Sequence, residues 1–275
     1  MLSAPTPVVH LARLGLLGHP SWGPWVRHVI VRTTDRTMPA SLELVAGNRL
    51  LASLPTTDRE RIAPLLTACH VGRGENISAP WEPLTEMMFP TSSVISVVAE
   101  TAEGDSVEVG TIGREGMVGS TLLLDGGLSP LRVMCQIEGD ALTGTPEDLM
   151  EADVDGLLHS LVLRYANTLL VQASITAACN RLHPLEQRAA RWLLTISDRL
   201  DQPKFDLTHE FFAVLIGAQR PSVTIAAREL QQDGLITYHR GRVEITHRAG
   251  LRAAACGCYA TITEHYVRSM GLPLG

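Results

Sequence analysis

The sequence lacks several features that mark common classes of protein. No stretch approaches eighteen uninterrupted apolar residues, so no transmembrane helix is expected. The five cysteines are odd in number and scattered, which favours reduced thiols in the cytoplasm over a disulfide framework. Neither the G-x-S-x-G pattern of a nucleophile elbow nor a phosphate-binding P-loop occurs, so we expect no catalytic residues and no enzyme.

The segment 1–40 also lacks a clear period. It holds several arginines but only one acid before Met38, and it has neither the charged start nor the apolar stretch of a secretory signal. We expect either a disordered tail or a chain whose translation starts at Met38.

Positive charge is scarce overall but locally concentrated. The chain carries a net charge of -6, whereas residues 202–252 hold seven Lys and Arg against five acids, a local charge of +2. Charge of this kind allows local binding of a polyanion without a uniformly basic surface.

Residues 41–154 read as helices followed by a β-rich domain. Short apolar runs at 93–100, 106–113 and 131–139 end at glycine or acidic turns, which is typical of a β-sandwich or barrel. No histidine and only Cys135 occur between residues 71 and 158. We therefore expect no haem in this domain, and we expect no metal site and no cofactor in the chain as a whole.

Residues 155–182 predict one long helix. Its apolar positions alternate three and four apart, as in a coiled coil, which favours helix-to-helix dimerisation; packing onto its own domain is the alternative. The predicted dimerisation residues are Leu158, Leu161, Tyr165, Thr168, Gln172, Ile175 and Cys179.

Residues 183–252 have the spacing of a winged helix-turn-helix. Thr208 can cap a first helix, Gly217 can supply a left-handed turn, and Pro221 fits the first turn of a second helix. The run 235–247 predicts a hairpin with Arg240 and Gly241 at its tip. In the helical extension 253–275, Cys256 and Cys258 are too close for C-x-x-C metal spacing and are interpreted as structural thiols.

These stretches together resemble the Crp/Fnr family of bacterial transcription regulators. The resemblance covers about residues 48–251 and rests on 89–100, 107–119, 177–194 and the winged helix-turn-helix. It implies an α+β chain: an N-terminal β-roll (a cyclic-nucleotide-binding-like jelly roll), a long dimerisation helix and a C-terminal winged helix-turn-helix.

The resemblance also implies roles at the DNA. Arg220 matches an arginine that reads a guanine edge, and Ser222 a phosphate contact. The chain departs from the family at Pro221 and Ile225, where an acid and a second arginine are usual, so we expect a different target sequence. The DNA-binding candidates are Thr208, His209, Gln219, Arg220, Pro221, Ser222, Thr224, Ile225, Arg228, His239, Arg240 and Arg242.

The sensor end departs further from the family. Ser120 stands where cyclic-nucleotide binders have a glutamate, and Ser129-Pro130 where they have Arg-Ser. A buried phosphate without its cation carries a heavy desolvation penalty, so control by cyclic AMP is not expected. The N-terminal cysteines of iron–sulfur members are absent. The candidate effector-pocket residues are Gly119, Ser120, Thr121, Ser129 and Arg132.

The resulting hypothesis is a cytoplasmic homodimer that binds palindromic double-stranded DNA, with RNA polymerase as a candidate further partner, an unidentified effector and no membrane contact. The alternative is an effector-binding module of β-roll fold that has lost or altered its DNA reading. Pro221 and Ile225 keep this alternative open.

Overall fold

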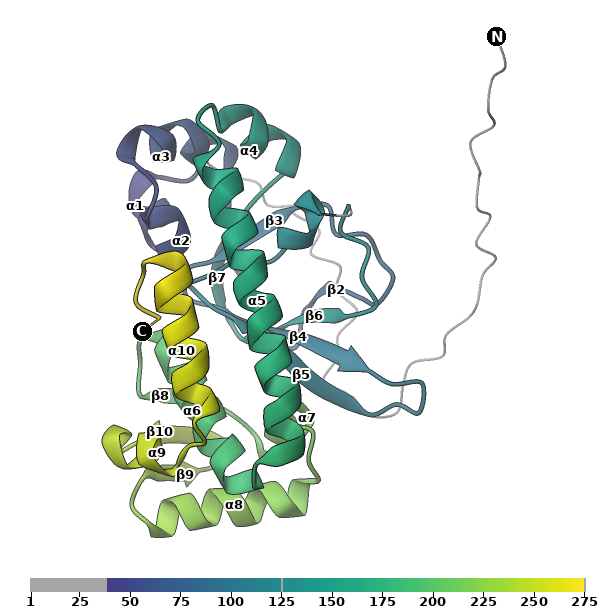
Figure 1. Ribbon diagram of the computed structural model, residues 1–275, viewed down its shortest axis with the longest axis vertical. Coiled ribbons are helices and arrows are strands. Elements are labelled where there is room, and N and C mark those ends of the chain that lie inside the picture. Colours follow the sequence, from purple (N-terminus) through teal and green to yellow (C-terminus); the bar gives the residue numbers. More distant parts are fainter. Residues whose placement is uncertain (1–38, 125, 275) are drawn as a thin grey trace.

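The computed structural model describes residues 39–124 and 126–274, so the N-terminal tail expected over 1–40 lies almost entirely outside the described residues. Two sheets and a group of short helices form the N-terminal part, and a long helix runs in front of them (Figure 1). A smaller helical part with its own sheet lies at the other end of that long helix (Figure 1). Within the described residues, no helix combines the length and the hydropathy needed to cross a membrane.

The β-roll consists of two antiparallel sheets that share one apolar core. One sheet has the order β1-β7-β3 and the other β2-β6-β4-β5. Phe89 and Leu142 of the first sheet belong to the same buried cluster as Ile95 and Ile112 of the second. The strands are β1 (Thr67–Val71), β2 (Asn76–Ser78), β3 (Met87–Pro90), β4 (Val94–Glu100), β5 (Ser106–Ile112), β6 (Arg132–Ile137) and β7 (Gly139–Gly144). The strands expected at 93–100, 106–113 and 131–139 are confirmed as β4, β5 and β6.

Short helices close one end of the β-roll. Thr145 caps the last of them by accepting a hydrogen bond from the backbone N–H of Asp148, and Pro146 occupies its first turn. They are α1 (Leu42–Ala46), α2 (Arg49–Ala52), α3 (Thr56–Ile62), the 3₁₀ turn η2 (Ala63–Leu65) and α4 (Pro146–Ala152). A further 3₁₀ turn, η3 (Ser120–Leu123), contacts the long helix that follows α4.

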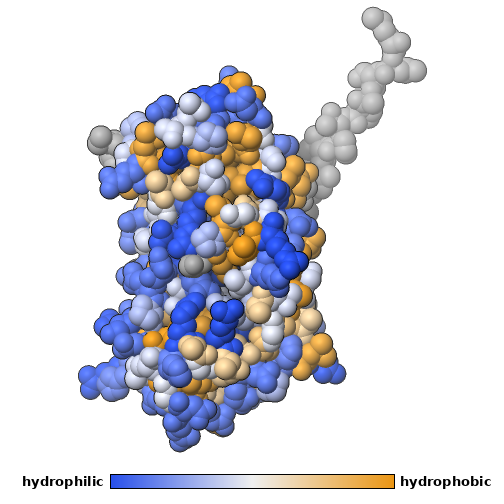
Figure 2. All heavy atoms as spheres, turned by 60° about the vertical axis from the view of Figure 1, so that its left-hand side comes forward, coloured by the Kyte–Doolittle hydropathy of each residue, from blue (hydrophilic) through white to orange (hydrophobic). Residues whose placement is uncertain are grey.

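The long helix α5 (Leu157–Leu182) and the C-terminal helix α10 (Cys258–Met270) lie side by side and run in opposite directions (Figure 1). The return of α10 joins the end of the chain to the β-roll: the Tyr266 hydroxyl donates to the Glu115 carbonyl at 2.6 Å. Tyr266 and Met270 are part of the β-roll core. The side of the molecule on which α10 lies is shown in Figure 2, where hydrophobic residues gather mostly in the upper half.

The seam predicted for dimerisation faces the interior of its own chain. Tyr165 is packed so tightly against Gly116 that a Cβ added to Gly116 would lie 1.9 Å from the Tyr165 hydroxyl. Gln172 Nε2 donates to the Thr111 carbonyl at 3.3 Å. Because the β-roll and α10 cover this face, its side chains are not available to a second protomer, and that assignment is corrected. Buried are Leu158, Leu161, Tyr165, Thr168, Gln172 and Cys179, and Ile175 is half-buried.

The C-terminal part is a winged helix-turn-helix. Its three-stranded sheet has the order β8-β10-β9 and packs with the helices around a second apolar core that contains Trp192, Phe212 and Val243. The elements are α6 (Leu185–Leu200), β8 (Lys204–Asp206), α7 (His209–Leu215), α8 (Arg220–Gln232), β9 (Ile236–His239), β10 (Arg242–Ile245) and α9 (Arg248–Ala254).

A buried polar network joins this domain to the β-roll and α5. The Arg199 side chain of α6 forms a salt bridge with Glu115 (Nε–Oε1, 3.0 Å), and it donates to the Thr111 carbonyl at 2.9 Å and to Gln172 Oε1 at 3.0 Å. Nearby, Trp192 Nε1 donates to Glu108 Oε1 at 2.9 Å. Burial raises the pKa of Glu108. The hydrogen bonds that its carboxylate accepts act in the opposite direction, because they stabilise the charged form.

Candidate nucleic-acid interface and effector cavity

The turn between α7 and α8 is set by local sequence. The Thr208 hydroxyl accepts a hydrogen bond from the Phe211 N–H and so caps α7. Gly217 has φ 58°, a left-handed conformation, and lies directly against Val107 of β5, so a side chain there would be both strained and crowded. Pro221 occupies the first turn of α8, where its missing N–H costs no helical bond.

The underside of α8 anchors the helix and leaves its other edge in solvent. Val223, Ala226, Ala227 and Leu230 are buried. The outer edge holds a mixture of polar, basic and apolar side chains from the start of the helix onward. Gln219, Arg220, Pro221, Ser222, Ile225 and Arg228 are exposed, and Thr224 is half-buried.

Arg220 is the most prominent cation at the start of α8. Its Nη2 lies 3.0 Å from Oε1 of Glu210 on α7, and both side chains are largely exposed. Exposed pairs of this kind contribute little to stability, so the guanidinium can exchange the carboxylate for another acceptor.

His209 and Thr224 brace α7 against α8. The Thr224 hydroxyl and His209 Nδ1 are 3.0 Å apart, and the imidazole packs edge-on against the Tyr238 ring with centroids 4.4 Å apart. Burial lowers the pKa of His209, which favours a neutral ring at pH 7. These side chains hold the helix-turn-helix together from the inside, which the sequence alone did not indicate.

The wing is a tight hairpin between β9 and β10. Arg240 and Gly241 both have positive φ, 49° and 77°, as a two-residue loop matching the strand twist requires. His239, Arg240 and Arg242 are exposed. Arg242 Nε pairs with Asp206 Oδ1 of β8 at 3.0 Å, a partner that sequence reasoning did not assign.

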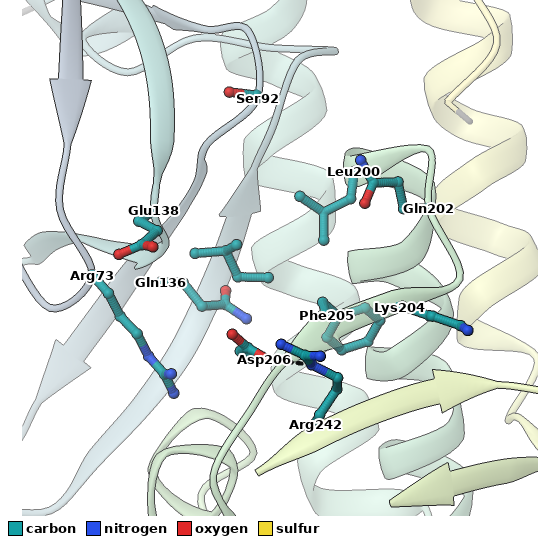
Figure 3. A pocket seen from close by; sticks show the side chains of 11 residues that line it. Arg73, Ser92, Gln136, Glu138, Leu200, Gln202, Lys204, Phe205, Asp206 and Arg242 are labelled. Carbon is teal, nitrogen blue, oxygen red and sulfur yellow. Dashed lines mark hydrogen bonds and ion pairs between the residues drawn. The ribbon is translucent and has the colours of Figure 1, made fainter.

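A cleft separates this wing from the β-roll. Arg73, Gln136 and Glu138 of the β-roll lie on one side of it, and Asp206 and Arg242 of the wing sheet lie on the other (Figure 3). Its volume is about 440 Å³, and its lining mixes charges of both signs. Because acids lie among the cations, the cleft is not suited to an anionic ligand alone.

A second cavity, of about 530 Å³, lies between the β-roll and α5. Four of the five candidate effector-pocket residues line it, namely Gly119, Ser120, Thr121 and Ser129. Leu163, Ala166 and Leu170 of α5 complete the wall with apolar surface. None of the described residues that line the cavity carries a charged side chain.

Arg132, the fifth candidate, does not line this cavity. Successive side chains of a strand alternate between faces, and Leu131 and Val133 are the ones that point into the cavity. Arg132 instead forms a salt bridge with Glu100 at 2.6 Å and donates to Asn76 Oδ1 at 3.0 Å. The assignment of Arg132 to the effector pocket is therefore corrected.

Comparison with known proteins agrees with this architecture. Residues 187–254 match the model of the Crp-like helix-turn-helix domain. The HTH-type transcriptional regulator Cmr of Mycobacterium tuberculosis is 29% identical over 228 residues, which cover 73% of this chain and 91% of Cmr. These matches show a Crp-like helix-turn-helix domain in this chain and support a regulator of the Crp/Fnr type.

Solved structures show the same fold at low sequence identity. FixK2 from Bradyrhizobium japonicum has a TM-score of 0.60 at 15% identity, over 70% of this chain and 98% of that one. A CRP-family transcriptional regulator from Thermus thermophilus has a TM-score of 0.57 at 19% identity, over 75% of this chain and 98% of that one. The predicted class, a β-roll with a long helix and a C-terminal helix-turn-helix, is confirmed. The helix-turn-helix match and the regulator relatives support a DNA-binding transcription regulator.

Proposed function

We propose that this regulator acts as a homodimer that inserts the start of α8 from each protomer into successive major grooves of a palindromic site. The observation that carries the proposal is the exposed edge of α8, where Arg220 and Ser222 lie in solvent above a buried apolar underside. Two recognition helices related by a twofold axis reach grooves about 34–36 Å apart. DNA as the partner in turn implies the cytoplasm, with RNA polymerase as a candidate second contact.

In this proposal, only a few side chains contact the DNA bases and phosphates directly. Arg220 suits two hydrogen bonds to a guanine, Ser222 a phosphate, and Ile225, which is 54% exposed, a thymine methyl. Arg240 at the tip of the wing suits a flanking phosphate, whereas Thr208 and His209 already serve α7 and its packing.

Fluorescence anisotropy with upstream DNA tests the DNA-reading role. Arg220→Ala is expected to weaken specific binding by about 1–3 kcal/mol, because a bidentate contact to guanine is lost. Non-specific binding at low salt should change much less. Arg268→Ala on α10 is the control, since Arg268 is also exposed and paired with a glutamate but lies far along the chain from α8. Equal specific affinity of wild type and Arg220→Ala would show that the recognition-helix assignment is wrong. No specific affinity in either protein would favour the module that has lost DNA reading.

A stripe on the outer face of α5 is the proposed dimer surface. It consists of Leu163, Asn167, Leu170, Ser174 and Ala177, all exposed and spaced three or four apart. This spacing is that of a coiled-coil seam, and its small members let two helices approach closely. Since Leu163 and Leu170 also line the effector cavity, a second protomer on the stripe would cover that cavity as well.

Sedimentation equilibrium tests the stripe. Leu170→Glu is expected to shift the protein to monomers, because a dimer would have to bury two facing carboxylates. Val154→Glu, at an apolar side chain that is 73% exposed outside α5, is the control and should stay dimeric. A Leu170→Glu protein that remains dimeric would exclude this face.

The effector proposed for the cavity is a largely apolar molecule rather than cyclic AMP. No described lining residue supplies a cation for a phosphate, and the hydroxyls of Ser120, Thr121 and Ser129 offer neutral hydrogen bonds only. Isothermal titration calorimetry is expected to show no cyclic AMP binding at micromolar concentrations. A dissociation constant in the micromolar range or below would contradict this.

A further inference from the structure

Four side chains of metal-ligand type converge where α5 ends and α10 begins. Cys179 lies in the last turn of α5, and His183 is the residue that follows the helix. Cys256 and Cys258 stand at the other side, before and at the start of α10. The four donor atoms all lie within 4.8 Å of one another.

The distances fit ligands of a single tetrahedral ion. Cys179 Sγ and Cys256 Sγ are 3.4 Å apart, and Cys258 Sγ and His183 Nδ1 are 3.6 Å apart. A zinc ion with Zn–S bonds of about 2.3 Å holds its sulfurs about 3.8 Å from one another. Cys179 and Cys256 are not joined in a disulfide, whose S–S length is about 2.05 Å. An iron–sulfur cluster places several irons and sulfides between its thiolates, so it requires a wider ligand set.

The burial of the four groups suits a structural site with an entry path. Cys179 and Cys256 are buried, whereas His183 and Cys258 are partly exposed. As neutral thiols, the three cysteines make weak contacts, Cys179 with Cys256 and Cys258 with His183. As thiolates, together with the imidazole, they form a standard structural zinc set.

We propose that Cys179, His183, Cys256 and Cys258 bind one Zn²⁺ ion. The sequence predicts structural thiols at Cys256 and Cys258, because their spacing is unlike C-x-x-C, and it predicts a dimer-seam position for Cys179. Folding supplies what the spacing lacked: Cys179 and His183 lie one helical turn apart, and α10 brings the second pair to them.

The proposed ligands lie at both chain ends of the winged helix-turn-helix domain. His183 separates α5 from α6, and Cys256 follows α9, so the ligands flank the whole winged helix-turn-helix. Zinc at this point would close the domain at both of its chain ends and fix it to the C-terminal end of α5. Because thiolates must be deprotonated and reduced to bind zinc, the clamp is lost at low pH or on oxidation.

Metal analysis of the full chain tests the proposal. Protein purified under reducing conditions without chelator is expected to contain one zinc per chain by plasma mass spectrometry. After removal of the zinc, added Co²⁺ should give the visible absorption of tetrahedral cobalt with thiolate ligands. His183→Asn and Cys258→Ser, both at partly exposed positions, are each expected to weaken zinc binding at least tenfold in competition with a chromogenic chelator.

The matched control is Cys69→Ser, because Cys69 is a half-buried cysteine in β1, outside the cluster. It should retain one zinc and the cobalt spectrum. Reduced wild-type protein that takes up neither ion would overturn the proposal without reference to any variant. Acid-labile sulfide with iron in the purified protein, or an unchanged zinc affinity in both His183→Asn and Cys258→Ser, would overturn it as well.

Discussion

Two arginine–glutamate pairs in this chain have the same separation and opposite surroundings. Arg199 and Glu115 are 3.0 Å apart with side chains 2% and 1% exposed, while Arg220 and Glu210 are 3.0 Å apart with side chains 64% and 45% exposed. Water weakens the attraction in the second pair and solvates each partner if they separate. The distance alone therefore says nothing about what a pair does; its burial separates a fixed joint from a contact that can be exchanged.

The buried pair is a joint between three parts of the molecule. Arg199 comes from α6, Glu115 from the loop after β5, and Gln172, which accepts from Arg199, from α5. Gly113 lies against this group so closely that an added Cβ would be 2.6 Å from Arg199 Cβ. The Arg199 contacts with Glu115, Thr111 and Gln172 thus depend on the β-roll, the long helix and the DNA-binding domain being together.

Arg199→Ala removes the cation of the buried pair and has the largest expected effect on the free energy of unfolding. Removing the guanidinium leaves the Glu115 carboxylate buried without its counter-charge, which costs about 3–5 kcal/mol of the free energy of unfolding. Urea denaturation followed by circular dichroism measures the loss.

Arg268→Ala is the matched control for stability. Arg268 also pairs with a glutamate, Glu264, but in solvent, so its removal should change the free energy of unfolding by less than about 1 kcal/mol. Comparable losses in Arg199→Ala and Arg268→Ala would show that the burial of the first pair has no energetic weight.

The exposed site was predictable from sequence because its signals are local. The Thr208 cap, Gly217 and Pro221 each act within one turn of chain, and all three occupy the expected positions. The hairpin tip at Arg240 and Gly241 follows from the same kind of short-range rule. The turn and capping residues were thus sufficient to place α7, α8 and the wing.

The buried joint was not predictable because its partners are far apart in the sequence. No pattern in the sequence near Arg199 indicates that its side chain donates to the carbonyl of Thr111, 88 residues away. The face of α5 was misassigned for a related reason: apolar residues line two sides of the helix, and periodicity cannot tell which side meets the β-roll. The cysteine cluster likewise appears only when α10 folds back on α5.

Glu210→Gln tests the exposed pair by removing the carboxylate that Arg220 contacts. The substitution removes a negative charge from the surface that we propose faces DNA, and it frees Arg220 from a competing carboxylate. We expect specific DNA binding to become tighter by less than about 1 kcal/mol, the range for one exposed ion pair, when measured by anisotropy at fixed salt. Glu210 is also in the first turn of α7, where an acid favours the helix, so stability should fall by about 0.3–1 kcal/mol.

The opposite signs of these two changes identify the cause. A variant that merely loosened α7 would lose stability and DNA affinity together, whereas exchange of Glu210 for DNA as the partner of Arg220 predicts lower stability with higher affinity. Glu264→Gln removes the same charge from the exposed pair on α10 and should leave DNA affinity unchanged. If Glu210→Gln weakens DNA binding, then Glu210 holds Arg220 in its reading position, and the exposed pair is a fixed contact like the buried one.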